Sequence, residues 1–465
     1  MIKNLLNHQT KNITSAAAIL AVTSLFSALL GLFRDRLLAG KFGAGDELDI
    51  YYAAFRIPDF IAMTLIMGAI GAAIVPVFSQ YLVKGRKDAL EFLSNLLNLF
   101  LFISITTCAI LFIFTPQLIS LIAPGFLAEK KELTVLLTRI MFLSPLLLGI
   151  SNIISAILRV FQRFLITSLS PIMYNLGIIL GILFFVPRIG LQGLAWGVAL
   201  GGFLHLLIQV PILTQVGFRP KKIFNFTQPG FREVIKLTIP RSIGLAASQI
   251  NLVVITAIAS KLASGSIAVF NLAESLSRPL LTFIGVAFST AAFPTLSLAF
   301  SKGDGGKFSR VFSSAFSKII FLILPLSLLL FLLRELIVKI ILKSGKFGLV
   351  DIHLTATCLG MFSLGVFAQS LILLIAKAFY ATHDTKIPAI ASVIGMLLNI
   401  GLCFLFIWLF SFPNFFQENL INFFNLQNLE EIQVIGLPLA ISLSAIFQFL
   451  ILFFLFWKKI YGKPI

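Results

Sequence analysis

Charged residues that could bind an anion gather near the start of the sequence, within stretches that are otherwise apolar. The set comprises Arg34, Asp35, Arg36, Asp46, Glu47, Asp49, Arg56 and Asp59. Guanidinium groups suit phosphate because each fork donates two parallel hydrogen bonds. The pattern therefore indicates a cationic pocket in which Arg34 and Arg56 hold an anionic headgroup, while Asp35 and Asp49 orient or release the arginines. The alternative is that residues 34–36 end the first helix at the membrane surface, where long side chains reach water.

A second pair of charges occurs in the other half of the chain. Glu274 and Arg278 are four residues apart in an apolar stretch. A glutamate four residues before an arginine is the favourable order for an ion pair on one helix. The pair either lines the same cavity, opposite Arg56, or neutralises itself as a structural pair.

Composition places these charges inside a membrane. Apolar residues make up 58% of the 465 residues and charged residues only 12%, and the mean hydropathy is +1.03. A soluble domain is usually about 45–50% apolar and about 25% charged. Lipid must therefore surround most of the chain. The net charge of +18 is typical of cytoplasmic loops that meet anionic lipid, and no soluble domain is visible that would bind nucleic acid.

The apolar runs predict an all-α polytopic membrane protein with about twelve transmembrane helices, since a span needs about 20 apolar residues. The expected spans are 14–33, 57–80, 92–115, 134–158, 165–186, 190–216, 238–260, 267–297, 315–341, 354–378, 387–410 and 433–457. The residues KFGAG between the first two spans should form a bent connection because of Gly43 and Gly45. Most of the 36 lysines and arginines fall in cytoplasmic segments if both termini are cytoplasmic.

An internal repeat predicts two pseudo-symmetric six-helix lobes. The segment AAIVPVFSQYLVKG around Pro76 aligns with TAAFPTLSLAFSKG around Pro294. The expected organisation is an N-terminal lobe at 1–216, a basic cytoplasmic interfacial linker at 217–237, and a C-terminal lobe at 238–465. A duplicated pair of bundles predicts a binding cavity near the membrane midplane. Prolines within the spans, such as Pro58 and Pro279, would permit kinks.

Several chemistries have no residues to support them. Cys108, Cys358 and Cys403 lie in apolar runs without metal or disulfide spacing, and none of the four histidines forms a paired ligand motif. No Walker A or GxSxG sequence occurs. We therefore expect a transporter rather than an enzyme, without metal or cofactor. It would be driven by a Na⁺ or H⁺ gradient, the membrane potential or substrate flow.

Five motifs resemble the MurJ/MviN lipid II flippase family. They are LLGLFRDRLLAGKFGAGDELDIYYAAFRIPDF at 29–60, LAWGVALGGFLHLLIQVP at 194–211, LASGSIAVFNLAESL at 262–276, SGKF at 344–347 and AKAFYATHDTKIP at 376–388. They occur in the family's order and extend over nearly the whole chain. The resemblance implies the fold of the multidrug/oligosaccharidyl-lipid/polysaccharide (MOP) exporter superfamily. It also implies that Arg34, Asp35, Asp49 and Arg56 match polar signature residues.

The resemblance further implies the function. We expect alternating access that moves undecaprenyl-pyrophosphate-linked peptidoglycan precursor, lipid II, from the inner to the outer leaflet of a bacterial inner membrane. The expected partners are this precursor, anionic lipids at the cytoplasmic loops and proteins of cell-wall synthesis. We expect a monomer and no nucleic acid.

The sequence departs from the family pattern at several charged positions. Family members usually carry charged residues at the positions that here are Ala28, Ala62, Met63, Met67 and Ser275. Some members also carry a carboxylate or an amide at a proposed sodium site, where this chain has Ile255. Typical members have fourteen spans. These departures keep other readings open, namely a flippase for another polyprenyl-linked oligosaccharide, an ion-coupled small-molecule exporter of the same superfamily, or a scaffold that lost transport.

Overall fold

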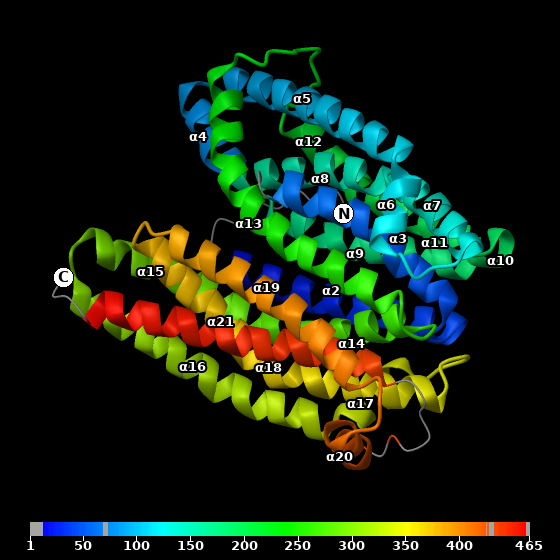
Figure 1. The fold of residues 1–465 in the computed structure, drawn as a ribbon. Helices are drawn as coiled ribbons and strands as arrows, with labels where there is room; N and C mark the ends of the chain where they lie inside the picture. The colour runs from blue at the N-terminus through cyan, green and yellow to red at the C-terminus, as the bar shows by residue number, and fades with distance from the viewer. Residues whose placement is uncertain (1–12, 68–72, 425, 427–431, 462–465) are drawn as a thin grey trace. The chain divides into compact units, whose positions relative to one another are not determined.

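The computed structural model describes residues 13–67, 73–424, 426 and 432–461, and every element among them is helical (Figure 1). By its contacts the chain divides into two compact units. Unit 1 comprises residues 1–38 and 50–253, and unit 2 comprises residues 39–49 and 254–465. The division of the chain into lobes at 217–237 stays a prediction. Within that segment a long helix, α13, begins at Pro229.

Unit 1 contains most of the helices in the first half of the chain. They are α2 (Ile13–Phe42), α3 (Asp46–Ile61), η1 (Ala62–Met67), α4 (Val75–Lys84), α5 (Arg86–Ile113), α6 (Thr115–Ile122), α7 (Ala128–Met141), α8 (Leu143–Val160), α9 (Phe164–Leu180), η3 (Gly181–Phe185), α10 (Val186–Ile189), α11 (Gln192–Leu207), α12 (Val210–Gln215) and α13 (Pro229–Ala259). The end of α2, the start of α3 and the end of α13 belong to unit 2. Phe78, Phe92 and Ile157 are fully buried in the main apolar core of unit 1.

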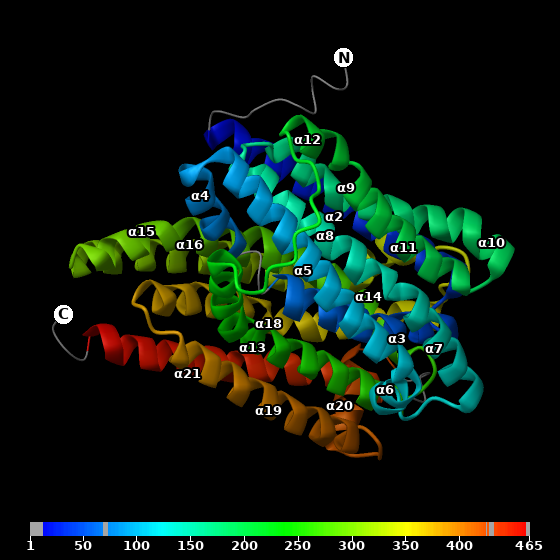
Figure 2. The ribbon, with the colours of Figure 1, turned by 90° about the horizontal axis from the view of Figure 1, so that it is seen from above.

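Unit 2 contains the remaining helices. They are α14 (Ser266–Leu280), η4 (Leu281–Val286), α15 (Ala287–Ser301), α16 (Gly305–Leu332), α17 (Arg334–Leu342), α18 (Leu349–Ala381), α19 (Lys386–Leu409), α20 (Phe415–Phe424), η5 (Gln433–Ile435) and α21 (Gly436–Tyr461). Figures 1 and 2 both show α21 running beside α18 and α19. Ile319, Leu374 and Phe379 lie at the centre of the unit's apolar core.

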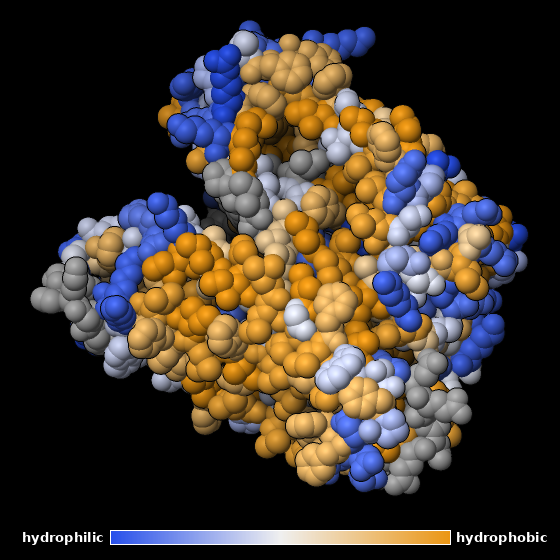
Figure 3. All heavy atoms as spheres, in the orientation of Figure 1, coloured by the Kyte–Doolittle hydropathy of each residue, from blue (hydrophilic) through white to orange (hydrophobic). Residues whose placement is uncertain are grey.

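Ten helices of the described residues are long and apolar enough to cross a membrane. They coincide with ten of the twelve predicted spans. The predicted span at 238–260 lies on α13, in which Leu245–Ala259 is a shorter apolar helix. Within the predicted span at 57–80, residues 68–72 lie outside the described part of the chain. In Figure 3 the surface over α19 and α21 is apolar along most of its length and becomes hydrophilic where α19 begins and α21 ends, as expected for helices that cross lipid.

The order of elements supports the internal repeat. Three pairs of elements in the two halves begin at residues 62 and 281, 86 and 305, and 115 and 334, each pair 219 residues apart. The first pair are the π-helical segments η1 and η4. Pro58 and Pro279 lie in α3 and α14, just before these segments, and a proline lacks the N–H that would continue the α-helical ladder. At Pro58 the freed carbonyl of Ala54 accepts a hydrogen bond from the Thr138 hydroxyl at 3.3 Å.

The segment after α12 lies along α5, within unit 1. The Asn95 amide donates to the carbonyl oxygen of Asn225 at 2.9 Å, and Lys221 pairs with Glu91 at 2.7 Å. Phe224 and Phe226 of this segment are 61% and 50% exposed. Exposed aromatic rings between basic residues fit the predicted interfacial role, which stays a prediction.

Glycines let α9, and η3 that continues it, pack backbone to backbone on α11. A Cβ added at Gly177 would lie 2.3 Å from the Cα of Gly201, and one at Gly181 would lie 2.5 Å from the Cα of Gly197. Small residues at such contacts are how membrane helices approach closely. These glycines therefore let α11, the first of the two helices within the predicted span at 190–216, pack closely in unit 1.

Replacing Gly177 by alanine should destabilise the protein by about 1–3 kcal/mol, because the added methyl overlaps backbone atoms that cannot rotate away. The matched control is Gly401→Ala in α19, where an added Cβ meets nothing within 4 Å. That change should be neutral or slightly stabilising, since alanine favours helix. Thermal unfolding of both variants in detergent provides the measurement. Equal melting temperatures for the two variants would contradict the close packing of α9 on α11.

Candidate functional site

Arg34, Asp35 and Arg36 lie inside a helix that is longer than the sequence predicted. Helix α2 continues to Phe42, more than a turn beyond Arg36, and the apolar span extends over Ala18–Phe42. The bend is confined to residues 43–45, where Gly43 has a φ of +69°. Residues 34–36 therefore do not end the first helix.

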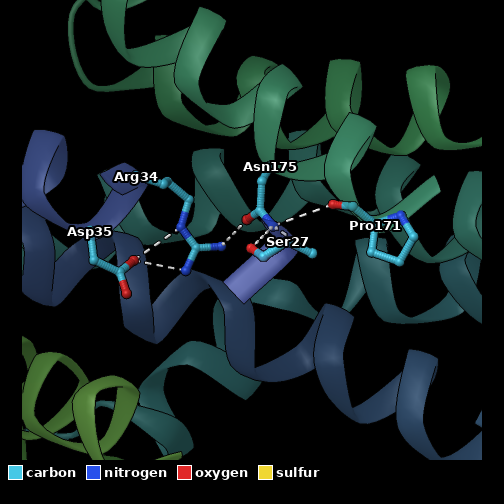
Figure 4. Close-up of polar contacts among 5 residues, drawn as sticks. All are labelled: Ser27, Arg34, Asp35, Pro171 and Asn175. Atoms are coloured by element: carbon cyan, nitrogen blue, oxygen red, sulfur yellow. Dashed lines mark hydrogen bonds and ion pairs between the residues drawn. The ribbon is translucent and has the colours of Figure 1, made fainter. Parts of the chain in front are cut away.

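The Arg34 guanidinium is held by two partners in unit 1 (Figure 4). Its Nε and Nη2 donate to one oxygen of Asp35 at 3.0 and 2.7 Å, and its Nη1 donates to the amide oxygen of Asn175 on α9 at 3.0 Å. The Asn175 amide nitrogen in turn donates to the carbonyl oxygen of Pro171 at 3.3 Å. Figure 4 shows Arg34 between Asp35 and Asn175, so that the fork is oriented from both sides.

Further polar side chains of unit 1 surround this arginine. Tyr51, Tyr52 and Tyr174 are near enough to interact electrostatically with Arg34. Arg56, on α3, is 7% exposed. Unit 1 thus brings together Arg34 and Asp35 of the predicted site with an asparagine and three tyrosines.

This arrangement leaves Arg34 able to bind an anion. The Arg34 side chain is 25% exposed, whereas that of Asp35 is 3% exposed. Three of the five N–H groups of the guanidinium donate in the bonds above, and the other two have no hydrogen-bond partner in the described part of the chain. Hydroxyl and amide groups nearby could bind the sugar or phosphate oxygens of a headgroup.

Asp49 lies in unit 2, where it caps a helix. Its two carboxylate oxygens accept hydrogen bonds from the backbone N–H groups of Gly265 and Ala268 at 2.8 and 2.9 Å. Gly265 is the N-cap residue of α14, which lacks a side-chain cap of its own. A carboxylate at a helix N-terminus is stabilised by the free N–H groups and the helix dipole. This contact joins the first and the third of the five motifs.

The glycine-rich connection of the first motif also packs against the fourth motif within unit 2. The backbone N–H of Lys346 donates to the carbonyl oxygen of Gly40 at 2.8 Å. Asp351 accepts from the N–H of Gly348 at 3.0 Å and from that of Ala44 at 3.3 Å. The signature at 39–49 is thus a segment that packs within unit 2, where it contacts the start of α14 and the loop before α18.

Glu274 and Arg278 form the predicted ion pair on α14. Their side chains meet at 3.0 Å and are 20% and 59% exposed. The pair lies in unit 2, as Asp49 does, whereas Arg34, Asp35 and Arg56 lie in unit 1. Whether it lines a cavity stays a prediction.

The motif AKAFYATHDTKIP contains a structural carboxylate between two spans. Asp384 accepts from the backbone N–H groups of Lys386 and Ile387 at 3.2 Å each, at the start of α19, and pairs with Lys459 of α21 at 2.8 Å. Partial burial would raise the pKa of Asp384, but Lys459 and the two N–H groups outweigh it and hold that pKa below its ordinary value.

Sequence reasoning missed Asn175 and the tyrosines of this cluster. It considered ionisable residues and prolines, and Asn175 occurs as an uncharged amide in the apolar run of α9. A polar side chain that must hydrogen-bond inside a membrane is itself a signal, because an unpaired one is costly there. Tyr51, Tyr52 and Tyr174 gave no such signal, because tyrosine is common at membrane surfaces.

Comparison with known proteins places this fold and these motifs in one family. The family model described as lipid II flippase MurJ matches residues 38–464. The chain belongs to the lipid II flippase MurJ family. A probable lipid II flippase MurJ from Buchnera aphidicola (subsp. Acyrthosiphon pisum) is 32% identical over 386 residues, which cover 82% of this chain and 75% of that protein. The lipid II flippase MurJ of Burkholderia cenocepacia is 28% identical, covering 81% of this chain and 74% of its own.

Solved structures agree with the family. A lipid II flippase MurJ in an inward closed conformation superposes with a TM-score of 0.77 at 27% identity, covering 94% of this chain and 87% of its own. An inward-facing multidrug resistance MATE family transporter of the MOP superfamily gives a TM-score of 0.75 at 14% identity, covering 96% and 98%. The second likeness shows the shared fold alone. The predicted family is thereby confirmed, and so is the predicted all-α fold that it shares with a MATE transporter.

Proposed function

We propose that this chain is a lipid II flippase, which moves the undecaprenyl-pyrophosphate-linked peptidoglycan precursor from the inner to the outer leaflet. The observation that carries the proposal is the family match over residues 38–464. The Arg34 cluster supports it, because an oriented, partly accessible guanidinium inside a membrane helix suits a pyrophosphate.

In this proposal the chain works as a transporter of the bacterial inner membrane and not as an enzyme, with both termini in the cytoplasm. Arg34 donates hydrogen bonds to the pyrophosphate, while Asp35 and Asn175 keep its fork oriented. Tyr52 and Tyr174, which are partly exposed, offer hydroxyl groups to the sugar. The prenyl tail remains in the bilayer, which spares it a large cost of exposure to water. A Na⁺ or H⁺ gradient or the membrane potential supplies the energy.

The test is replacement of the native flippase in a MurJ-depleted bacterium. Expression of the chain should restore growth and make lipid II accessible at the outer face of the membrane. Membrane insertion is checked by fractionation, so that a failure of expression is recognised. A well-inserted protein that restores neither growth nor accessibility would contradict lipid II as the substrate and favour another polyprenyl-linked oligosaccharide.

A further inference from the structure

A short amphipathic helix in unit 2 lies outside the candidate spans. Helix α20, Phe415–Phe424, has the sequence FFQENLINFF and comes between the spans Lys386–Leu409 and Gln433–Lys459. Asn414 fixes its start by accepting hydrogen bonds from the backbone N–H groups of Phe416 and Gln417 at 2.9 and 3.0 Å. At ten residues it is too short to cross a bilayer.

Helix α20 begins close to the end of the span on α19, which indicates its depth relative to the membrane. Five residues separate it from Leu409, the last residue of α19, so its start lies within about 20 Å of that span's end. The Gln417 side chain donates to the carbonyl oxygen of Phe410 at 3.2 Å.

On the other side α20 packs against the end of α16. The Phe424 ring lies 6.1 Å from the ring of Phe331, in the last turn of α16. The Arg334 guanidinium lies over both rings, at 4.6 Å from Phe424 and 5.0 Å from Phe331. In Figure 1 α20 lies beside the start of α17, where α16 has ended. Since the span on α16 ends at Leu332, α20 lies at the level where two spans leave the membrane.

The exposed surface of α20 has an aromatic edge and a polar edge. Phe416 and Phe423 are 63% and 65% exposed, and at 3.6 residues per turn they lie within about 20° of each other around the helix. Glu418 and Asn422 are also exposed and share an edge roughly 130° away. Phe415 lies between the two edges. The side that carries Phe424 packs on the protein, and the ring of Phe423 lies 6.4 Å from that of Phe331 at the border of this side.

The neighbouring span also carries exposed aromatic side chains where it ends, before α20 begins. Trp408, 60% exposed, and Phe412, 37% exposed, meet edge to face at 5.1 Å at the end of α19. Aromatic side chains concentrate where membrane meets water, because their rings prefer the headgroup region to either phase. Because this exposed pair marks the end of the span that precedes α20, a bilayer rather than a protein is the expected partner of the aromatic edge.

We propose that α20 is an in-plane membrane anchor that inserts Phe416 and Phe423 into the lipid interface and keeps Glu418 and Asn422 in water. The partner is the phospholipid surface at which α16 and α19 end. Interfacial helices of this kind bind through buried apolar area while their polar edge stays hydrated. Through the stacked Phe424 and Arg334, the anchor ties the α16–α17 corner to that surface.

Fluorescence quenching in proteoliposomes tests this placement in the full-length chain. Single variants Phe416→Cys and Phe423→Cys, and the matched Glu418→Cys and Asn422→Cys, are labelled with bimane. The native Cys108, Cys358 and Cys403 are buried, and the unsubstituted protein serves as the labelling blank. Lipids brominated in the acyl chain near the headgroup should quench the label at 416 and 423 but not at 418 and 422. Aqueous iodide should quench the label at 418 and 422 but not at 416 and 423.

Two outcomes would overturn the proposal. Strong iodide quenching on both edges would place α20 in water, away from the membrane. A label at 416 and 423 that is shielded from both quenchers would show a protein on that edge instead of lipid. Thermal unfolding of each labelled variant confirms that the fold is retained, since all four positions are exposed.

Discussion

Replacing Arg34 by alanine should abolish rescue of a MurJ-depleted bacterium, with accessible lipid II falling to the level of the empty vector. The variant loses the guanidinium that we propose donates to the pyrophosphate. Two charge-assisted hydrogen bonds are worth at least about 3 kcal/mol, or about a hundredfold in affinity. Arg34→Lys should restore little, because an ammonium cannot reproduce the planar fork that Asp35 and Asn175 orient.

The loss must be separated from simple misfolding. Removing Arg34 takes one ion-pair partner away from the buried carboxylate of Asp35, which can cost up to about 3–5 kcal/mol. The double variant Arg34→Ala/Asp35→Ala removes both charges and should recover stability without recovering transport. Arg310→Ala, at an exposed arginine on α16, is the matched control and should transport normally. Transport by the double variant would mean that Arg34 serves only to neutralise Asp35.

Replacing Asp49 by alanine should lower the free energy of unfolding by about 2–4 kcal/mol, as the sum of a lost helix cap and newly unpaired buried donors. The N–H groups of Gly265 and Ala268 would lose their acceptor at the start of α14. The docking of segment 39–49 within unit 2 would weaken with it. Asp49→Asn, which keeps one carbonyl oxygen as acceptor, should fall between the wild type and Asp49→Ala.

Thermal unfolding in detergent provides the measurement for Asp49. The control is Glu47→Ala, which removes the same charge from the same turn of α3 at an exposed position. That change should cost no more than about 1 kcal/mol. If both variants unfold at the same temperature, Asp49 does not cap α14, and a role in positioning the arginines gains weight.

Much of the fold could be predicted from the sequence, because membrane insertion depends on local composition. A run of about 20 apolar residues must form a helix in lipid, whatever its neighbours. Ten predicted spans accordingly coincide with helices of the structure. One difference lies at the first span, expected to end near residue 33. The charges at 34–36 interrupt the apolar run, yet α2 continues to Phe42, because the buried Asp35 carboxylate pairs with Arg34 and Asn175 binds the same arginine.

The candidate site could be predicted only in part. The i, i+4 pair of Glu274 and Arg278 followed from spacing along one helix. The partner of Arg34 did not, because Asn175 is 141 residues away and reaches it only through the packing of α9 beside α2.

The sequence by itself determined that this protein is a helical membrane transporter with arginines inside apolar stretches, since these properties depend on composition and neighbouring residues. Only the tertiary structure decided which polar groups from distant parts of the sequence meet. It placed Arg34 with Asn175, and it assigned Asp49 to the cap of α14, 216 residues away. A buried polar group must find its hydrogen-bond partner somewhere, but the identity of that partner depends on which helices pack together.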